Sequence, residues 1–156
     1  MTGPVPSTPP ALPVTWLPRR SRAVLLTASA VLAAVFVGMA LVLPPSWQLN
    51  DRVMLVMLGL CFSAVGLMLA RPRVVASAEG VLVVNHLRSR QLAWAEILRV
   101  NLRQGDPWAT LDLADGTSLA AMGIQPGGGR EQAIRAAVQL RDLVELHGAA
   151  GEPAHA

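Results

Sequence analysis

The residues in this sequence that could do chemistry are mostly arginines. All 13 basic side chains are arginine, against 10 Asp and Glu, so the formal net charge is +3. A positive charge is typical of nucleic-acid-binding proteins, but no aromatic residues interleave with these arginines as stacking platforms. We therefore expect that the protein does not bind nucleic acid. We expect instead that six arginines form an outward-facing basic surface: Arg71, Arg73, Arg88, Arg90, Arg99 and Arg103.

Catalytic and metal-binding patterns do not occur in the sequence. The motifs G-x-S-x-G, H-E-x-x-H and G-x-x-x-x-G-K-[ST] are missing. His86, His147 and His155 have no metal-ligand spacing to one another or to Cys61, the single cysteine, which also rules out a disulfide framework. Glu96 has no partner acid, base or metal for catalysis. The sequence predicts a protein that is not an enzyme and uses no cofactor and no metal.

A glycine-rich stretch with the sequence PGGGRE, residues 126–131, has some features of an anion site. Gly128, Gly129 and Arg130 precede a helical pattern, and free backbone N–H groups at the start of a helix can hold an anion. The alternative is a flexible connector in which glycine gives the chain freedom to turn. Because the lysine and hydroxyl of a phosphate loop are missing, we favour the connector and keep the weak anion site as the second interpretation.

Two uncharged apolar runs precede most of these residues. As helices, residues 23–43 would extend about 31 Å and residues 53–70 about 27 Å, against a hydrocarbon core of about 30 Å. Between them a Pro-Pro-Ser-Trp sequence ends the first helix and supplies a tryptophan suited to a membrane interface. Residues 19–72 are therefore predicted to form a transmembrane hairpin embedded in the lipid bilayer.

The arginine distribution predicts the orientation of the hairpin. Arginines precede the first span and follow the second, while the loop carries one Arg beside one Asp. By the positive-inside rule, both termini lie in the cytoplasm of a multi-pass protein in a bacterial plasma membrane. A signal peptide is the competing interpretation, because Arg19, Arg20 and Arg22 form a basic n-region and residues 38–40 resemble a cleavage site. The second span favours two retained helices.

The segments outside the hairpin differ in composition. Residues 1–18 are rich in proline and are predicted to be a disordered tail, with a second flexible tail over residues 149–156. Residues 73–148 consist of short apolar segments separated by turn residues, which predicts a folded domain. Six segments read as strands, namely residues 74–77, 81–86, 91–94, 97–103, 108–113 and 117–122.

Periodicity within the domain predicts which side chains face its core. Leu98, Val100 and Leu102 alternate with polar residues and are expected on one face of a strand. Asp115-Gly116 is a tight-turn dipeptide between two later strands. From residue 130 to 147 the spacing becomes helical, with a C-terminal cap expected at Gly148 and an apolar stripe formed by Ile134, Ala137, Leu140 and Val144.

The predicted fold is a membrane α-helical hairpin followed by a small all-β antiparallel barrel or roll, capped by a C-terminal helix. Four local features of the sequence accompany this fold: Glu79-Gly80 before a strand, Arg88 and Arg90 at a hairpin, Trp94-x-Glu96-Ile97 at the start of a strand, and Asp115-Gly116. With these features the sequence resembles the bacterial pleckstrin-homology-like (PH-like) domains, and in particular the small actinobacterial two-span membrane proteins of the low-molecular-weight antigen type. The resemblance covers roughly residues 20–148.

The resemblance implies a PH-like domain attached to a membrane hairpin. Trp94 and Ile97 are expected to pack in the core, and Glu96 to face solvent or bond local backbone. PH-like domains elsewhere bind inositide headgroups with basic residues in the first hairpin loop, and we take that loop to be residues 78–80, which carry no arginine. We therefore expect a protein- or peptide-binding scaffold with an unidentified protein partner. The alternatives are contact with anionic lipid headgroups, or a small subunit of a transport or envelope complex.

Overall fold

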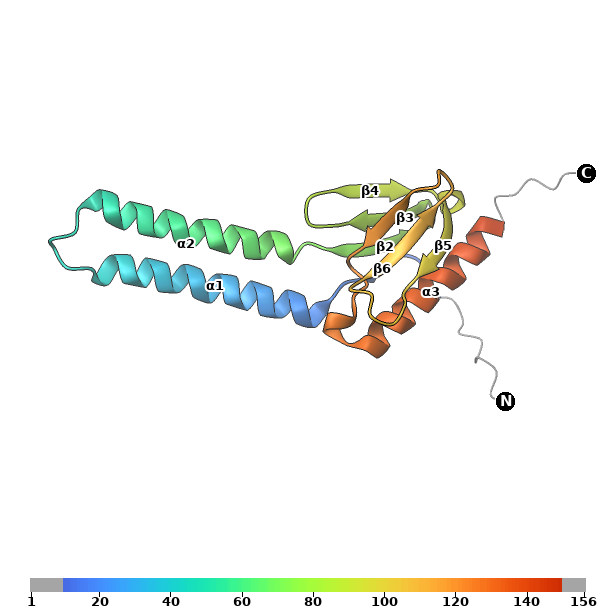
Figure 1. Ribbon diagram of the computed structural model, residues 1–156, viewed down its shortest axis with the longest axis horizontal. Coiled ribbons are helices and arrows are strands. Elements are labelled where there is room, and N and C mark those ends of the chain that lie inside the picture. The colour runs from blue at the N-terminus through green and yellow to red at the C-terminus, as the bar shows by residue number, and fades with distance from the viewer. Residues whose placement is uncertain (1–9, 150–156) are drawn as a thin grey trace, which may run out of the picture. The chain divides into compact units, whose positions relative to one another are not determined.

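The computed structural model describes residues 10–149, and the chain divides into two compact units (Figure 1). One unit comprises Arg19–Arg71. The other comprises Met1–Pro18 together with Pro72–Ala156, so it is built from chain on both sides of the first. The tail expected over residues 149–156 lies outside the described residues, apart from the backbone of its first residue.

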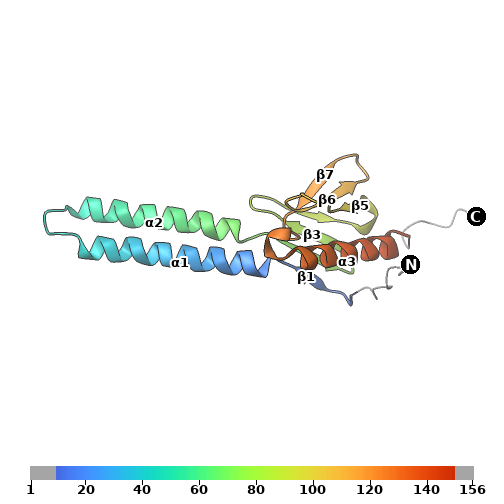
Figure 2. The ribbon, with the colours of Figure 1, turned by 60° about the horizontal axis from the view of Figure 1, so that its bottom comes forward.

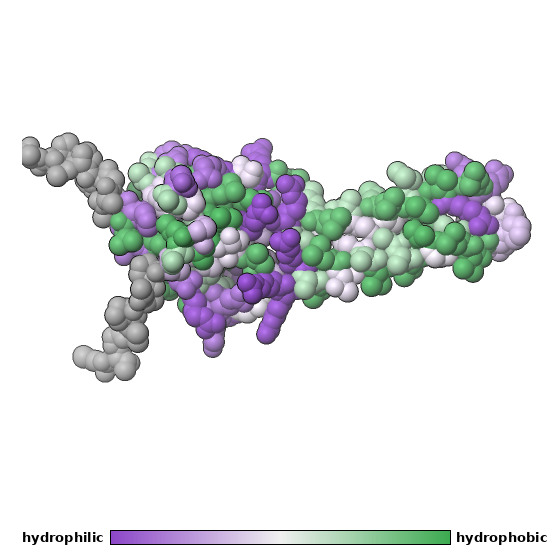
Figure 3. Space-filling model, turned by 180° about the vertical axis from the view of Figure 1, so that it is seen from behind, coloured by the Kyte–Doolittle hydropathy of each residue, from purple (hydrophilic) through white to green (hydrophobic). Residues whose placement is uncertain are grey.

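The Arg19–Arg71 unit is a pair of antiparallel helices, α1 (Arg19–Val42) and α2 (Leu49–Leu69) (Figures 1 and 2). By length and composition both helices could cross a membrane. Only 11% of each apolar stretch is buried inside the protein, which distinguishes them from the core helices of a globular domain. Apolar side chains cover the face of the hairpin seen in Figure 3, and polar ones gather at its loop end.

Small residues of α2 allow the two helices to approach closely. A Cβ on Gly59 would lie 2.7 Å from Cγ of Phe36, and a Cβ on Gly66 would collide with the hydroxyl of Ser29. Between these glycines, the hydroxyl of Ser63 lies 2.9 Å from the carbonyl oxygen of Ser29 and 2.8 Å from that of Gly59. Its single hydrogen is shared between these two acceptors. These small residues of α2 therefore serve packing within the hairpin.

Arg52 of α2 secures the loop end of the hairpin. Its guanidinium donates to the carbonyl oxygens of Ala40 at 2.8 Å, Leu43 at 2.6 Å and Pro44 at 3.1 Å. These carbonyls lie at the C-terminal end of α1, where backbone acceptors have no partner within the helix. Arg52 thus caps the C-terminal end of α1.

The second unit contains two antiparallel sheets and a helix. The first sheet has the order β1-β2-β3-β4 and the second β5-β6-β7. The helix α3 lies along the sheets (Figure 2). The elements are β1 (Val14–Trp16), β2 (Arg73–Ser77), β3 (Gly80–Val84), β4 (Ser89–Leu92), β5 (Ile97–Asn101), β6 (Ala109–Leu113), β7 (Ser118–Ala121) and α3 (Arg130–Ala149), with short 3-10 turns at Trp94–Glu96 and Pro126–Gly128.

The strand β1 corrects the prediction of a disordered tail over residues 1–18. Val14, Thr15 and Trp16 pair with Ala76, Val75 and Val74 of β2. Trp16 is 9% exposed, and its Nε1 donates a hydrogen bond of 3.1 Å to Gln139 Oε1 on α3. Burial of an indole stabilises this segment despite its neighbouring prolines. Residues 1–9 lie outside the described residues.

Because β1 precedes α1 and β2 follows α2, the hairpin is inserted between two paired strands of one sheet. The first strand connection of the domain is therefore the whole hairpin. The acidic turn at residues 78–80 joins β2 to β3. Our identification of that turn as the first hairpin loop was wrong, because it depended on counting β2 as the first strand.

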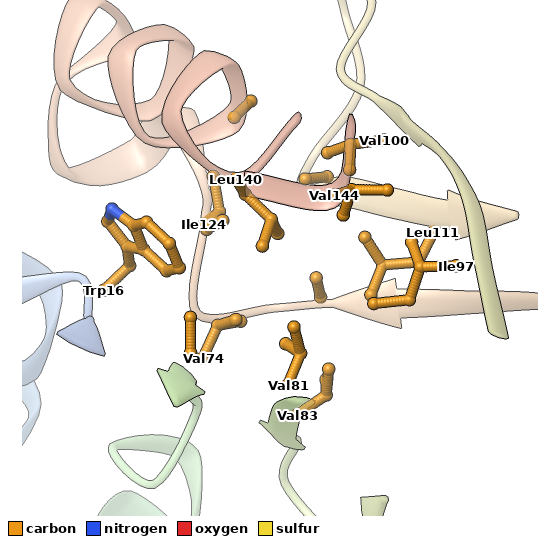
Figure 4. Close-up of a cluster of buried hydrophobic side chains, with 14 of the residues drawn as sticks. Trp16, Val74, Val81, Val83, Ile97, Val100, Leu111, Ile124, Leu140 and Val144 are labelled. Atoms are coloured by element: carbon orange, nitrogen blue, oxygen red, sulfur yellow. The ribbon is translucent and has the colours of Figure 1, made fainter. Parts of the chain in front are cut away.

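A single hydrophobic core lies between the two sheets and α3 (Figure 4). Ala109, Leu111 and Leu113, which alternate with polar residues along β6, are buried. So are Trp94 and Ile97, which were expected to pack there. The largest side chains with less than 2% exposure are Leu92, Leu111, Ile124, Leu140, Leu143, Val74, Val81, Val83 and Val100.

Three details of the predicted core pattern were wrong. A register shift between Ile97 and Arg99 turns Leu98 outward, so that it is 61% exposed, as a β-bulge does to strict alternation. Ile134 is 44% exposed because α3 buries the neighbouring stripe that begins at Ala133. Gly148 lies inside α3, which runs to Ala149, and does not cap it.

Candidate functional site

Two surfaces of the β unit collect the predicted site residues. The first, which we call the tether end, is the end of the sheets where β1 ends and β2 begins. Arg73 opens β2 and pairs in register with Val84, which also pairs with Ser89. Arg88 is the neighbour of Ser89 and accepts a backbone hydrogen bond from Asn85 at 2.8 Å. The strand register therefore places Arg73 and Arg88 at the same end.

The residues around the 3-10 turn Pro126–Gly128 complete the tether end. A Cβ on Gly128, which is buried, would lie 3.8 Å from Cα of Pro18, the residue that leads from β1 towards α1. Arg130 is the first residue of α3 and is exposed. It lines a cavity of about 150 Å³ together with Arg103 from the loop after β5. Two arginines assigned by sequence to different sets are thus brought together.

The arginines of the tether end form no ion pair within the described residues. The ion pairs in residues 10–149 are Arg90–Asp115 and Arg135–Glu131, and neither includes an arginine of the tether end. The carboxylate lining the cavity, Asp106, accepts the backbone N–H of Arg103 at 2.8 Å. Arg73, Arg88, Arg103 and Arg130 therefore present a net positive surface.

Gly128, Gly129 and Arg130, the residues of the expected weak anion site, lie at the turn into α3. Gly128 is buried, and Gly129 adopts a φ of 136°, a conformation that favours glycine. Neither glycine lines the cavity that Arg130 shares with Arg103. The glycines thus serve the turn into α3, as the connector interpretation states, whereas the cationic groups come from Arg103 and Arg130.

The second surface is a groove between β5 and α3 of about 280 Å³. Its residues from β5 include Leu98, Arg99 and Asn101, and those from α3 include Arg141 and Glu145. The strand β5 is at the edge of its sheet. Arg141 Nη2 donates to the carbonyl oxygen of Val100 at 2.9 Å, so a side chain of α3 already bonds this backbone acceptor of β5.

The remaining sequence-predicted residues have other environments. Arg90 forms an exposed ion pair with Asp115 at 3.3 Å, so its charge is partnered within the domain. Arg71 follows α2 and is exposed. Glu96 accepts the backbone N–H of Ala93 at 2.7 Å, as expected of a side chain at the start of β5. Cys61 is exposed on α2.

His147 lies in a packing contact with an aromatic ring. His147 stacks on Trp94 with ring centroids 4.7 Å apart, and its Nδ1 lies 2.9 Å from Leu143 O. Trp94 Nε1 donates to the carbonyl oxygens of Ser77 and Ala78 at 3.2 and 3.3 Å. His155 lies outside the described residues. Within residues 10–149 there is no cluster of three or more potential metal-binding side chains.

Asp115 provides a test of the local electrostatics. Its pKa is lowered chiefly by the hydroxyl of Thr117, then by the backbone N–H of Thr117, with a smaller contribution from Arg90. Its contribution to stability is therefore present above the ordinary carboxyl pKa and is lost as the pH falls through the lowered value. We expect Thr117→Val to raise the pKa of Asp115 more than Arg90→Gln does. A carboxyl NMR titration measures both, and a larger effect of Arg90→Gln would contradict this assignment.

Seven antiparallel strands in two sheets, closed by a C-terminal helix, define the β unit as a PH-like domain. Residues 71–143 match the family model described as bacterial PH domain, so the predicted resemblance is confirmed over this segment. The strand β1 lies outside the matched segment. Sequence reasoning missed β1 as well, although Val-Thr-Trp is a composition typical of strands.

The curated relatives are mycobacterial. The chain is 34% identical over 98 residues to Uncharacterized protein Mb1452 of Mycobacterium bovis and to Uncharacterized protein Rv1417 of Mycobacterium tuberculosis. The match covers 63% of this chain and 63% of each relative, so the chain spans less than two thirds of their length. This agrees with the actinobacterial resemblance. No solved structure matches the chain.

Proposed function

We propose that this chain is a non-enzymatic integral membrane protein that presents its PH-like domain to the cytoplasm as a docking scaffold. The partner is a protein that contributes an extended peptide segment. The observation that carries the proposal is the groove between β5 and α3, which combines an edge strand, an exposed leucine and an exposed arginine. Extended peptides add to such edges through main-chain hydrogen bonds, while neighbouring side chains give specificity.

The membrane part of the proposal rests on the helices and on the strand order. The helices α1 and α2 are long and apolar enough to cross a bilayer. Since β1 and β2 pair in one sheet, the chain has to return to the side from which it left, as two spans accomplish. The arginines at the outer ends of the pair, Arg19, Arg20, Arg22 and Arg71, favour the cytoplasm for this side.

The groove favours a peptide with an acidic residue next to an apolar one. Leu98 is 61% exposed and supplies an apolar contact. Arg99 beside it is exposed and has no ion pair within the described residues. A carboxylate on the peptide would pair with Arg99. An entering strand would also compete with Arg141 for the carbonyl oxygen of Val100.

The test uses the full chain in lipid nanodiscs and peptides selected against it from a display library. We expect bound peptides to protect the β5 amides from hydrogen exchange, and Arg99→Glu to weaken binding at least about tenfold, corresponding to ~1.4 kcal/mol. The matched control is Arg135→Glu, which reverses a 68% exposed charge on α3 outside the groove. Peptides that bind Arg99→Glu and the native chain equally would contradict the proposal.

A second candidate function is contact of the tether end with anionic lipid headgroups. Two residues separate β1 from α1 and three separate α2 from β2, so the element ends that they join are at most about 11 and 14 Å apart. Each arginine near an anionic leaflet contributes about 1 kcal/mol. In the same exchange experiment, protection of residues 102–106 in anionic but not zwitterionic nanodiscs would favour this candidate. Equal exchange in both would remove it.

A further inference from the structure

The loop end of the hairpin contains an apolar groove that neither the docking scaffold nor the tether end involves. It measures about 320 Å³ and is lined from α2 by Leu49, Val53, Val56 and Met57. Leu41 of α1 closes its other side and is 76% exposed. Positions 49, 53 and 56 follow the spacing of one helix face. From residue 49 to residue 57 the groove extends about 12 Å along the helix axis.

A positive charge lies at the loop end of this groove. Arg52 lines it and is held in place by the carbonyl oxygens of Ala40, Leu43 and Pro44. These three acceptors leave other N–H donors of the guanidinium free, because arginine carries five. Arg52 has no carboxylate partner within residues 10–149. Its neighbour Asp51 instead accepts the backbone N–H of Gln48 at 3.0 Å.

We propose that this groove binds one glycerophospholipid, with an acyl chain along α2 and the phosphate on Arg52. The inference rests on the membrane insertion proposed above. The groove follows the helix axis from a polar end, near the 48% exposed Trp47, into an apolar stretch. A phospholipid in a bilayer likewise runs from a polar headgroup at the interface to an apolar acyl chain in the hydrocarbon core. An arginine held by backbone carbonyls offers the phosphate a fixed cation with free N–H donors.

The direct test is native mass spectrometry of the full chain, delipidated in detergent and then supplied with phosphatidylglycerol or with an uncharged diacyl glycolipid. We expect one retained phosphatidylglycerol and no retained glycolipid. Val56→Trp fills the groove and should lower the bound fraction at least about tenfold at equal lipid concentration. The control Leu60→Trp adds the same bulk to α2 at a 49% exposed position outside the groove and should retain the lipid.

Met57→Trp is the second groove variant if Val56→Trp does not extract as a monodisperse protein. Equal retention by the groove variants and by Leu60→Trp would overturn the lipid site, as would equal retention of the glycolipid. Carbonate extraction of the native membranes tests the premise separately. A chain that resists extraction but retains no phospholipid contradicts only the lipid site, whereas a chain released by carbonate contradicts the proposed membrane insertion itself.

Discussion

Trp16→Ala is expected to destabilise the PH-like domain by about 3–5 kcal/mol, the usual effect of truncating a buried aromatic side chain to alanine. Trp16 is 9% exposed, belongs to the core cluster and donates a hydrogen bond to Gln139 on α3. Its loss removes packing from β1, β2 and α3 together. Hydrogen exchange of the full chain in detergent should show protection of the β2 and α3 amides falling by about two to four orders of magnitude.

Trp47→Ala is the matched control for this prediction. Trp47 lies between α1 and α2 and is 48% exposed, so its truncation should leave the exchange of β2 and α3 unchanged. Native-like protection in Trp16→Ala would mean that β1 does not contribute to the domain. The residues before the hairpin would then be a tail after all.

Gly59→Leu is expected to destabilise the hairpin by about 1–3 kcal/mol through overpacking. A Cβ on Gly59 already meets the ring of Phe36 on α1, so a larger side chain forces the helices apart. Spin labels on Cys61, which is exposed, and on a cysteine replacing Val35, which is 54% exposed, report the separation of the two helices. We expect the distance distribution between the labels to shift to longer values.

Gly38→Leu provides the control within the same hairpin. Nothing lies within 4 Å of a Cβ placed on Gly38, although this glycine also belongs to an apolar helix, α1. We expect its substitution to leave the label separation unchanged. Equal shifts in both variants would indicate a general effect of bulk in the membrane, and would contradict a specific contact between Gly59 and Phe36.

The sequence predicted the elements whose signal is local. Alternation in β6 and helical spacing after residue 130 were sufficient to predict both elements, because side-chain periodicity reports directly on which face is buried. The two apolar helices were equally clear. The bulge that exposes Leu98 could not be predicted, since the register shift depends on how β5 pairs with β6.

The strand β1 shows the limit of local signals most clearly. Three residues between prolines carry little information, and their partner β2 lies beyond the entire hairpin. Only tertiary pairing identifies them as part of the domain. The candidate site has the same limitation. The sequence supplied the arginines, but the proximity of Arg103 to Arg130 and the pairing of Arg90 with Asp115 both depend on the fold.

The insertion of the hairpin between β1 and β2 is the central feature of this protein. It also bears on the signal-peptide alternative, because cleavage near Ala40 would remove β1 and Trp16 from the domain. The most direct test is a disulfide between Thr15→Cys and Val75→Cys, which are partners in the register, in a Cys61→Ser background in native membranes. We expect rapid cross-linking within the full-length chain. A chain that lacks residues 1–40, or that does not cross-link, would contradict this architecture.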